Sequence, residues 1–143
     1  MSTALVIDDT DANRQFFERL LAQAGFLIRS AANGTNALKI ADELERLELA
    51  IIDMEIPDMS GLEIVARLRK RFPSACLVIA TMHDERTLMD SAFARGCDLF
   101  MVKPHGFVEL FKRLQTQGAE GLHASRPLVI DQYGLRNYGA YSA

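Results

Sequence analysis

The sequence predicts an α/β protein built on a doubly wound parallel sheet. Three observations support this fold class. Five short apolar runs alternate with segments whose apolar residues recur at helical spacing. Turn residues such as Gly, Pro and Asn separate the two kinds of segment. Polar residues follow four of the five runs at the end that would be the carboxyl end. Such alternation is typical of a parallel sheet covered by helices on both faces, so we expect five strands and five helices.

The first strands and helices occupy the first third of the chain. Residues 4–7 are a short apolar run, and Asp11 is placed to cap the helix that follows it. Residues 26–31 are the second predicted strand. A helix rich in Ala, Leu, Lys and Glu begins after Asn33 and is expected to reach about residue 48.

The second part of the chain continues the same pattern. The third strand is the apolar run that ends in Asp53, and a continuous run of this kind is typical of a strand buried on both faces. The helix after it begins near Gly61 and ends before Pro73. The other strands are expected at residues 75–80 and 98–102. The last helix carries apolar residues at the spacing i, i+3, i+4, i+7, which are Phe107, Leu110, Phe111 and Leu114.

Polar residues stand at the predicted carboxyl ends of four strands. They are Asp8, Asp9, Asp53, Thr81 and Lys103. In an open parallel sheet these ends meet at one edge, where ligands bind. Three adjacent carboxylates repel one another unless a cation joins them, and Mg²⁺ suits a site of few oxygen ligands. A lysine and a threonine beside them would bind an anion. Since carboxylates can accept phosphoryl groups, the set predicts phosphoryl chemistry on an aspartate.

The motifs around these residues resemble the receiver domain of two-component response regulators. They are Asp8-Asp9, the run DMEIPDMSG over residues 53–61, Thr81, and the run FMVKP over residues 100–104. The resemblance covers roughly residues 4–114. It implies a flavodoxin-like five-stranded sheet in the order 2-1-3-4-5.

The resemblance also implies the role of each acidic residue. Asp53 would be the phosphoacceptor. Asp9 would bind Mg²⁺ directly, Asp8 would bind it through water, and the backbone carbonyl of Glu55 would supply a further ligand. The metal set is therefore Asp8, Asp9, Asp53 and Glu55, with Mg²⁺ as the only cofactor.

The remaining motif residues would complete the site and carry the signal. Lys103 would contact the phosphoryl oxygens, and its bond to Pro104 is commonly cis in the family. Thr81 would move to hydrogen-bond the phosphoryl group, and Phe100 matches the aromatic switch position that turns inward with it. Glu55 and His83 lie two residues beyond the acceptor and the threonine, at positions that tune the lifetime of the phosphoryl group.

By resemblance the protein is a signalling switch, not an enzyme. A sensor histidine kinase or a phosphotransfer protein would donate the phosphoryl group. The output would be a protein contact through the face formed by the fourth helix, the fifth strand and the fifth helix. An alternative is an adaptor or dimerisation module with a receiver fold that does not use phosphate. A phosphohydrolase with an aspartyl-phosphate intermediate is a third reading, but such enzymes carry a second aspartate where this chain has Glu55.

Composition and length set limits on these readings. The chain has 143 residues and a net charge of −3, so neither nucleic acid nor a membrane surface is an expected partner. Two cysteines without metal-binding spacing, no apolar span and no leader-like start predict a cytoplasmic protein. We expect a receiver domain over residues 1–116 and a tail or linker over residues 117–143.

The tail is the least explained part of the sequence. It contains a strand-like apolar run at residues 127–130 and all three tyrosines, Tyr133, Tyr138 and Tyr141. Such a segment could add to a sheet edge, cover the last two helices, or exchange with a second copy in a homodimer. A flexible end remains the alternative.

Overall fold

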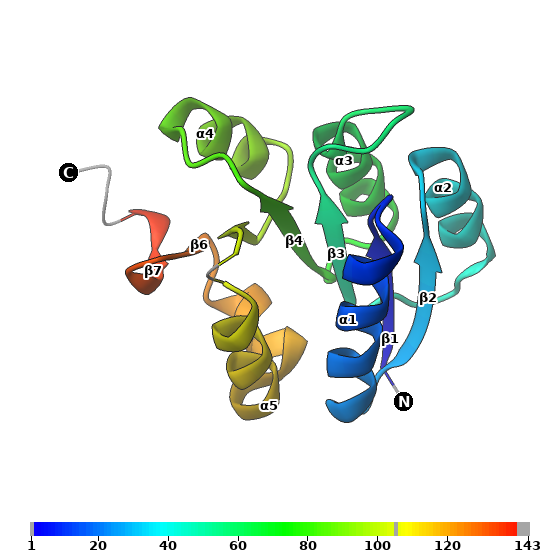
Figure 1. Cartoon of the computed structure of the whole chain (residues 1–143), viewed down its shortest axis with the longest axis horizontal. Helices are drawn as coiled ribbons and strands as arrows, with labels where there is room; N and C mark the ends of the chain where they lie inside the picture. Colours follow the sequence, from blue (N-terminus) through cyan, green and yellow to red (C-terminus); the bar gives the residue numbers. More distant parts are fainter. Residues whose placement is uncertain (1, 105, 140–143) are drawn as a thin grey trace.

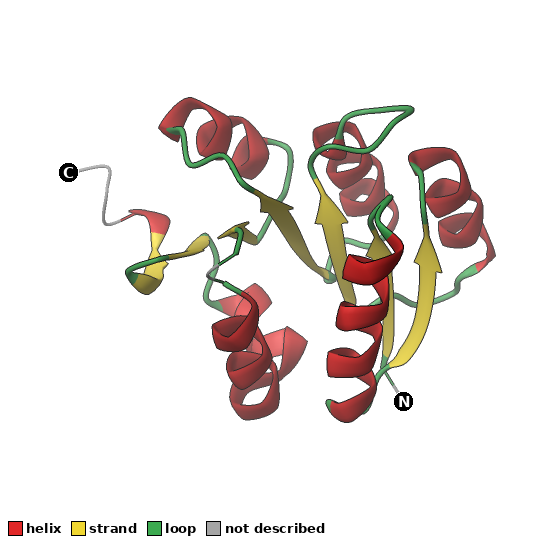
Figure 2. Cartoon of the chain, viewed as in Figure 1, coloured by secondary structure: helices red, strands yellow, loops and turns green. Residues whose placement is uncertain are grey.

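The chain folds around one sheet that is covered by helices on both faces (Figures 1 and 2). A computed structural model describes residues 2–104 and 106–139, and in this part of the chain the sheet order is β2-β1-β3-β4-β5-β6-β7. The strands are β1 (Thr3–Ile7), β2 (Leu27–Ala31), β3 (Leu49–Asp53), β4 (Cys76–Thr81), β5 (Leu99–Val102), β6 (Leu128–Asp131) and β7 (Gly134–Asn137). The helices are α1 (Asp11–Gln23), α2 (Gly34–Glu43), α3 (Gly61–Arg71), α4 (Arg86–Ala94) and α5 (Phe107–Ala124).

The first five strands confirm the predicted fold class. They are parallel and follow the order 2-1-3-4-5. Every residue of β3 and β4 is buried, as expected for central strands of a sheet that is covered on both faces. The register pairs Ile7 with Ile52 and Asp53 with Ala80, so the carboxyl ends of β1, β3 and β4 lie together.

Alternating side chains of the sheet form two separate cores. On one face the sheet packs against α2, α3 and α4, which contribute residues such as Ala37, Ile64 and Met89. On the other face it packs against α1 and α5 through residues such as Phe17 and Leu110. The period-two alternation of a strand therefore assigns neighbouring residues to opposite cores.

Two strands extend the sheet beyond the five that were predicted. β6 pairs in parallel with β5, and β7 returns antiparallel to β6. Leu128, Val129 and Ile130 are buried, which explains why this part of the tail docks. The tail thus adds to a sheet edge, one of the arrangements considered from the sequence. The domain boundary at residue 116 stays a prediction, and Tyr141 lies outside the described residues.

The last helix continues past the expected boundary but is interrupted. Gly118 has φ 72° and ψ 171°, which breaks the helical geometry inside α5. This φ lies in the left-handed region, where glycine carries little penalty. The second half of α5 buries Ala119 and Leu122 and leads the chain toward β6.

Two local expectations about helix ends were wrong. α2 ends at Glu43 instead of near residue 48, because Leu44 is extended and the Arg71 guanidinium binds the carbonyls of Ala41 and Leu44. Asp11 does not cap α1. Thr10 holds the cap position, and the Asp11 carboxylate pairs instead with Arg14.

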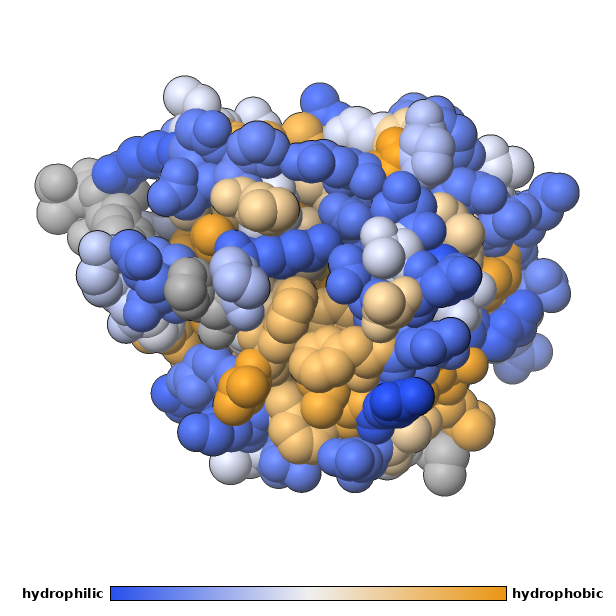
Figure 3. Space-filling view, viewed as in Figure 1, coloured by the Kyte–Doolittle hydropathy of each residue, from blue (hydrophilic) through white to orange (hydrophobic). Residues whose placement is uncertain are grey.

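Within the described residues, no helix is both long enough and apolar enough to cross a membrane. Figure 3, drawn from the same side as Figure 1, shows apolar side chains gathered over α1 and α5. Phe16 of α1 is 42% exposed and its ring lies 5.5 Å from that of Phe107, while Val108 of α5 is 63% exposed. This apolar area lies between the two helices that follow Asp9 and Lys103 in the chain.

Candidate phosphoacceptor site

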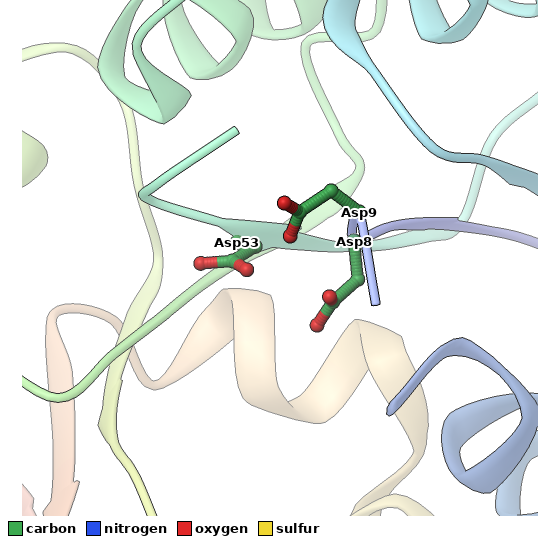
Figure 4. A group of neighbouring side chains, drawn as sticks. All are labelled: Asp8, Asp9 and Asp53. Carbon is green, nitrogen blue, oxygen red and sulfur yellow. The ribbon is translucent and has the colours of Figure 1, made fainter. Parts of the chain in front are cut away.

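Three carboxylates meet at the carboxyl edge of the sheet (Figure 4). Asp8 and Asp9 follow β1, and Asp53 ends β3. One carboxylate oxygen from each residue lies within 4.8 Å of the other two. Asp8 and Asp53 are buried, whereas Asp9 is exposed and leaves the cluster open to solvent. The structure therefore brings together the three acidic side chains that the sequence placed at the ends of two strands.

The Lys103 ammonium lies against the same cluster. Its Nζ is 3.5 Å from Oδ2 of Asp53 and 3.7 Å from Oδ2 of Asp8. The backbone N–H of Lys103 donates to the carbonyl of Thr81 at 2.7 Å, which fixes the start of the loop beyond β5. The bond between Lys103 and Pro104 is cis, as the resemblance implies.

Burial raises the pKa of Asp53 above its ordinary value of 3.8. The neighbouring Asp8 carboxylate raises this pKa further, because two negative charges at this distance repel. The backbone N–H of Glu55, which donates to Oδ1 of Asp53 at 3.0 Å, and the charge of Lys103 both lower it. The first two effects exceed the last two, so the ionised form of the Asp53 carboxyl is less favoured than in a free aspartate.

The donor set of this cluster fits a small divalent cation. Carboxylate oxygens are hard ligands, and Mg²⁺ needs few of them when water fills the remaining positions. The exposed carboxylate of Asp9 leaves room for that water, and a cation there would relieve the repulsion that raises the pKa of Asp53. The residues present therefore suit Mg²⁺, with Asp8, Asp9 and Asp53 as the side chains that would hold it.

Two loops flank the acidic cluster and contact each other. Oε1 of Glu55, in the loop after β3, lies 2.7 Å from Nε2 of His83, in the loop after β4. The Thr81 hydroxyl, at the end of β4, accepts a hydrogen bond from the backbone N–H of His83 at 3.2 Å. Thr81 is buried beneath this loop. The side chain of Glu55 thus turns toward His83, and the expected role of its backbone carbonyl as a metal ligand stays a prediction.

Phe100 is completely buried in the middle of β5. It pairs in register with Ile79 of β4 on one side and Val129 of β6 on the other. The structure therefore places the proposed aromatic switch inside the core shared with α4, and it leaves the edge of β5 covered by β6.

Sequence reasoning missed one residue that positions the loop after the acceptor. The Asp58 carboxylate accepts from the N–H groups of Gly34 and Thr35 at 2.8 and 2.9 Å and from the Thr35 hydroxyl at 2.7 Å. These bonds lower the pKa of Asp58 to about 2. No local signal links residue 58 to residues 34–35, because the contact exists only after α2 and α3 pack side by side.

Gly61, where the same loop ends and α3 begins, fixes how closely this helix approaches β3. A Cβ atom at this position would lie 2.8 Å from the carbonyl oxygen of Asp53 and from Cα of Met54. The first turn of α3 can therefore approach the acceptor strand only because residue 61 has no side chain.

Comparison with known proteins agrees with this geometry. Residues 4–115 match the family model described as response regulator receiver domain. A cyclic di-GMP phosphodiesterase of Thermotoga maritima is 29% identical over 131 residues, which are 92% of this chain and 33% of that protein. The chain spans only between 33% and 57% of the length of the first curated relatives that it matches.

Solved structures show the same fold. The chemotaxis protein CheY4 of Vibrio cholerae has a TM-score of 0.73 and 28% identity, over 81% of this chain and 98% of that one. A response regulator from Burkholderia pseudomallei also has a TM-score of 0.73 and 28% identity, over 87% of this chain and 72% of that one. The Burkholderia structure contains a phosphorylated aspartic acid, a calcium ion and citrate.

Proposed function

Because the chain belongs to the response regulator receiver family of two-component systems, we propose that it accepts a phosphoryl group on Asp53 and thereby switches its protein contacts. The observation that carries this proposal is the meeting of Asp8, Asp9, Asp53 and Lys103 at one sheet edge. The donor is a sensor histidine kinase or a phosphotransfer protein of the cytoplasm. The family is regulatory, and we assign no substrate turnover to this chain.

In the transfer, a carboxylate oxygen of Asp53 attacks the phosphorus of a phosphohistidine. The new P–O bond forms as the P–N bond breaks, and the departing imidazole nitrogen takes a proton from solvent. Lys103 neutralises charge on the phosphoryl oxygens, and the Thr81 hydroxyl donates to one of them. Asp8, Asp9, Asp53 and the Glu55 carbonyl would hold Mg²⁺, which supplies further charge neutralisation when bound. The burial of Asp53 limits competing contact with water.

The exposed apolar area of α1 and α5 supports the existence of a protein donor. Phe16 of α1 and Val108 of α5 are exposed. Figure 3 shows apolar side chains gathered over these two helices. Contiguous apolar surface of this kind marks protein contacts more often than free solvent-facing surface. A donor helix that docks there would contact the two helices that begin shortly after Asp9 and Lys103.

The test is labelling by a small phosphodonor. Wild-type protein, Asp53→Asn and the exposed control Asp42→Asn are incubated with acetyl phosphate and Mg²⁺ and analysed by intact mass. We expect one phosphoryl group on the wild type and on Asp42→Asn, and none on Asp53→Asn. Stoichiometric labelling of Asp53→Asn would refute the assignment. Tight Mg²⁺ binding without labelling of the wild type would favour the phosphate-independent adaptor.

A further inference from the structure

The C-terminal segment occupies the surface that was expected to carry the output. β6 pairs along the edge of β5, with Val129 opposite Phe100 and Ile130 opposite Met101. Val129 is fully buried and belongs to the same hydrophobic core as Phe100, Met89 of α4 and Tyr138 of the tail. A partner that needed the edge of β5 would find it already paired.

Tyr138 attaches the end of this segment to α4. Its ring lies 4.7 Å from the ring of Phe93 at an interplanar angle of 34°, and only 7% of the residue is exposed. Its hydroxyl contacts the Asp90 carboxylate and lies 3.3 Å from the carbonyl oxygen of Arg86. The Arg86 guanidinium carbon lies 5.8 Å from the centre of the same ring. We call residues Gly134–Tyr138 with these contacts the clasp.

The rest of the clasp is separated from the start of α4 by a groove. This groove has a volume of about 480 Å³ and is lined by residues of both sides, among them Met89, Tyr133 and Arg136. Beside the groove, Tyr133 is 78% exposed. Tyr138 thus holds the hairpin end against α4 beside this groove.

A chain of contacts leads from the phosphoacceptor to the clasp. The Thr81 hydroxyl binds the backbone N–H of His83, and the loop that contains His83 leads directly to Arg86, the first residue of α4. A phosphoryl group on Asp53 places new acceptor oxygens beside β4 and attracts the hydroxyl of Thr81. Movement of that hydroxyl would break its bond to His83 and act on the loop that leads to the first turn of α4, where Tyr138 is bound.

We propose that the clasp is closed while Asp53 is unphosphorylated and that phosphorylation of Asp53 opens it. This inference rests on the proposed function and deepens it, since it names how the acceptor site controls the output surface. An open clasp uncovers the half-buried ring of Phe93 and releases the Asp90 carboxylate from Tyr138, so that this side of α4 can bind a protein partner. By thermodynamic linkage, a broken clasp must in turn favour the phosphorylated form.

β6 stays in the sheet throughout. Coupling between two sites in a protein typically changes affinities ~5- to 150-fold. Removal of β6 would expose Leu128, Val129 and Ile130 and break ladders on both of its sides, a far larger penalty than such coupling can overcome. The moving part is thus the single ring of Tyr138 with the short strand before it.

The experiment measures hydrogen exchange and binding of a phosphoryl mimic in the full chain. Amide exchange over residues 128–139 is followed by mass spectrometry with and without beryllium fluoride and Mg²⁺. We expect faster exchange of residues 134–138 with the mimic and little change at residues 128–131. Tyr138→Ala should bind the mimic ~5-fold more tightly than the wild type, and Tyr138→Phe should show a smaller effect of the same sign.

Tyr133→Ala is the matched control, because Tyr133 is an exposed tyrosine of the same hairpin, whereas the ring of Tyr138 is buried against Phe93. It should bind the mimic as the wild type does. If the mimic binds but exchange at residues 134–138 is unchanged or slower, or if Tyr138→Ala binds it no more tightly, the clasp is refuted and the acceptor assignment stands. If acetyl phosphate does not label the wild type at Asp53, the proposed function and the clasp both fail.

Discussion

Nε2 of His83 lies 2.7 Å from Oε1 of Glu55, and this contact joins the two loops that border the phosphoacceptor. Both side chains are more than half exposed, at 53% and 63%, so the contact is a weak one that solvent screens. Its position gives it influence over the access of water to Asp53.

We expect the loss of this contact to shorten the life of the phosphoryl group. In Glu55→Ala or His83→Ala the two loops separate more often, and water reaches the phosphorus more easily. An exposed pair worth 0.2–1 kcal/mol corresponds to hydrolysis that is about 1.4- to 5-fold faster. The decay of labelled protein measures this rate. The double variant should match the single ones, because both remove the same contact. Glu63→Ala on α3 is the control, and slower decay in either single variant would contradict the expectation.

Replacement of Lys103 by methionine should destabilise the protein in the absence of metal. The variant leaves Asp8 and Asp53 together without the ammonium that lies within 3.7 Å of both. Loss of one partner of a fully buried pair costs about 3–5 kcal/mol, and since solvent reaches Lys103 we expect about 1–2 kcal/mol. Urea unfolding measures the change, with Lys112→Met on the exposed side of α5 as control. Mg²⁺ should reduce the difference in stability. A Lys103→Met variant as stable as the wild type would show that the ammonium does not offset the repulsion between Asp8 and Asp53.

Asp98 should contribute more to stability than any residue of the acceptor site. Its carboxylate is fully buried and accepts from Arg69 at 2.6 Å and from the N–H of Leu77 at 2.8 Å, and it lies 3.1 Å from Nδ1 of His123. Asp98→Ala leaves the charge of Arg69 and a buried N–H unmatched, so we expect a loss of about 3–5 kcal/mol in urea unfolding.

Asp98 lies beside the amino end of β5, at the opposite end of the sheet from Asp53. Under native conditions Asp98→Asn, the milder change, should therefore still be labelled by acetyl phosphate. A stability loss below about 1 kcal/mol for Asp98→Ala would show that its network is dispensable.

The contribution of Asp58 should depend on pH. Its pKa is lowered from 3.8 to about 2 by hydrogen bonds from Thr35 and Gly34. The folded protein thus releases this proton more readily than the unfolded chain, and the stabilisation is present above pH 3.8 and disappears as the pH falls through about 2. Urea unfolding of Asp58→Asn should show reduced stability near neutral pH and convergence with the wild type in strong acid. The free energy of unfolding of Asp42→Asn should follow that of the wild type at every pH. A difference between Asp58→Asn and the wild type that grows toward low pH would contradict this prediction.

Most of the fold and the core of the site follow from the sequence for a common reason. Strands such as β3 are continuous apolar runs, and four of the five predicted strands end in or are followed by a polar residue that the parallel topology carries to the same edge. Asp8, Asp53 and Lys103 could therefore be predicted to meet although they are far apart in the chain.

The features that escaped prediction depend on contacts between segments. The Asp58 carboxylate accepts from the first N–H groups of α2, and the Arg71 guanidinium donates to a carbonyl at the other end of the same helix. Both contacts form only because α2 and α3 pack together. Tyr138 could be recognised as an unusual residue of the tail, but its partners on α4 become apparent only once β6 has joined the sheet. Strand-like residues 127–130 predicted docking without defining the edge that would receive it.

The break at Gly118 limits how far a displacement at the acceptor can travel along α5. An unbroken helix would act as a rigid rod and transmit a tilt of its first turn to its last. Here the helical hydrogen bonding is interrupted between the half that begins after Lys103 and the half that carries His123 to Asp98. We therefore expect the contact between His123 and Asp98, at the far end of the molecule, to persist when Asp53 is phosphorylated.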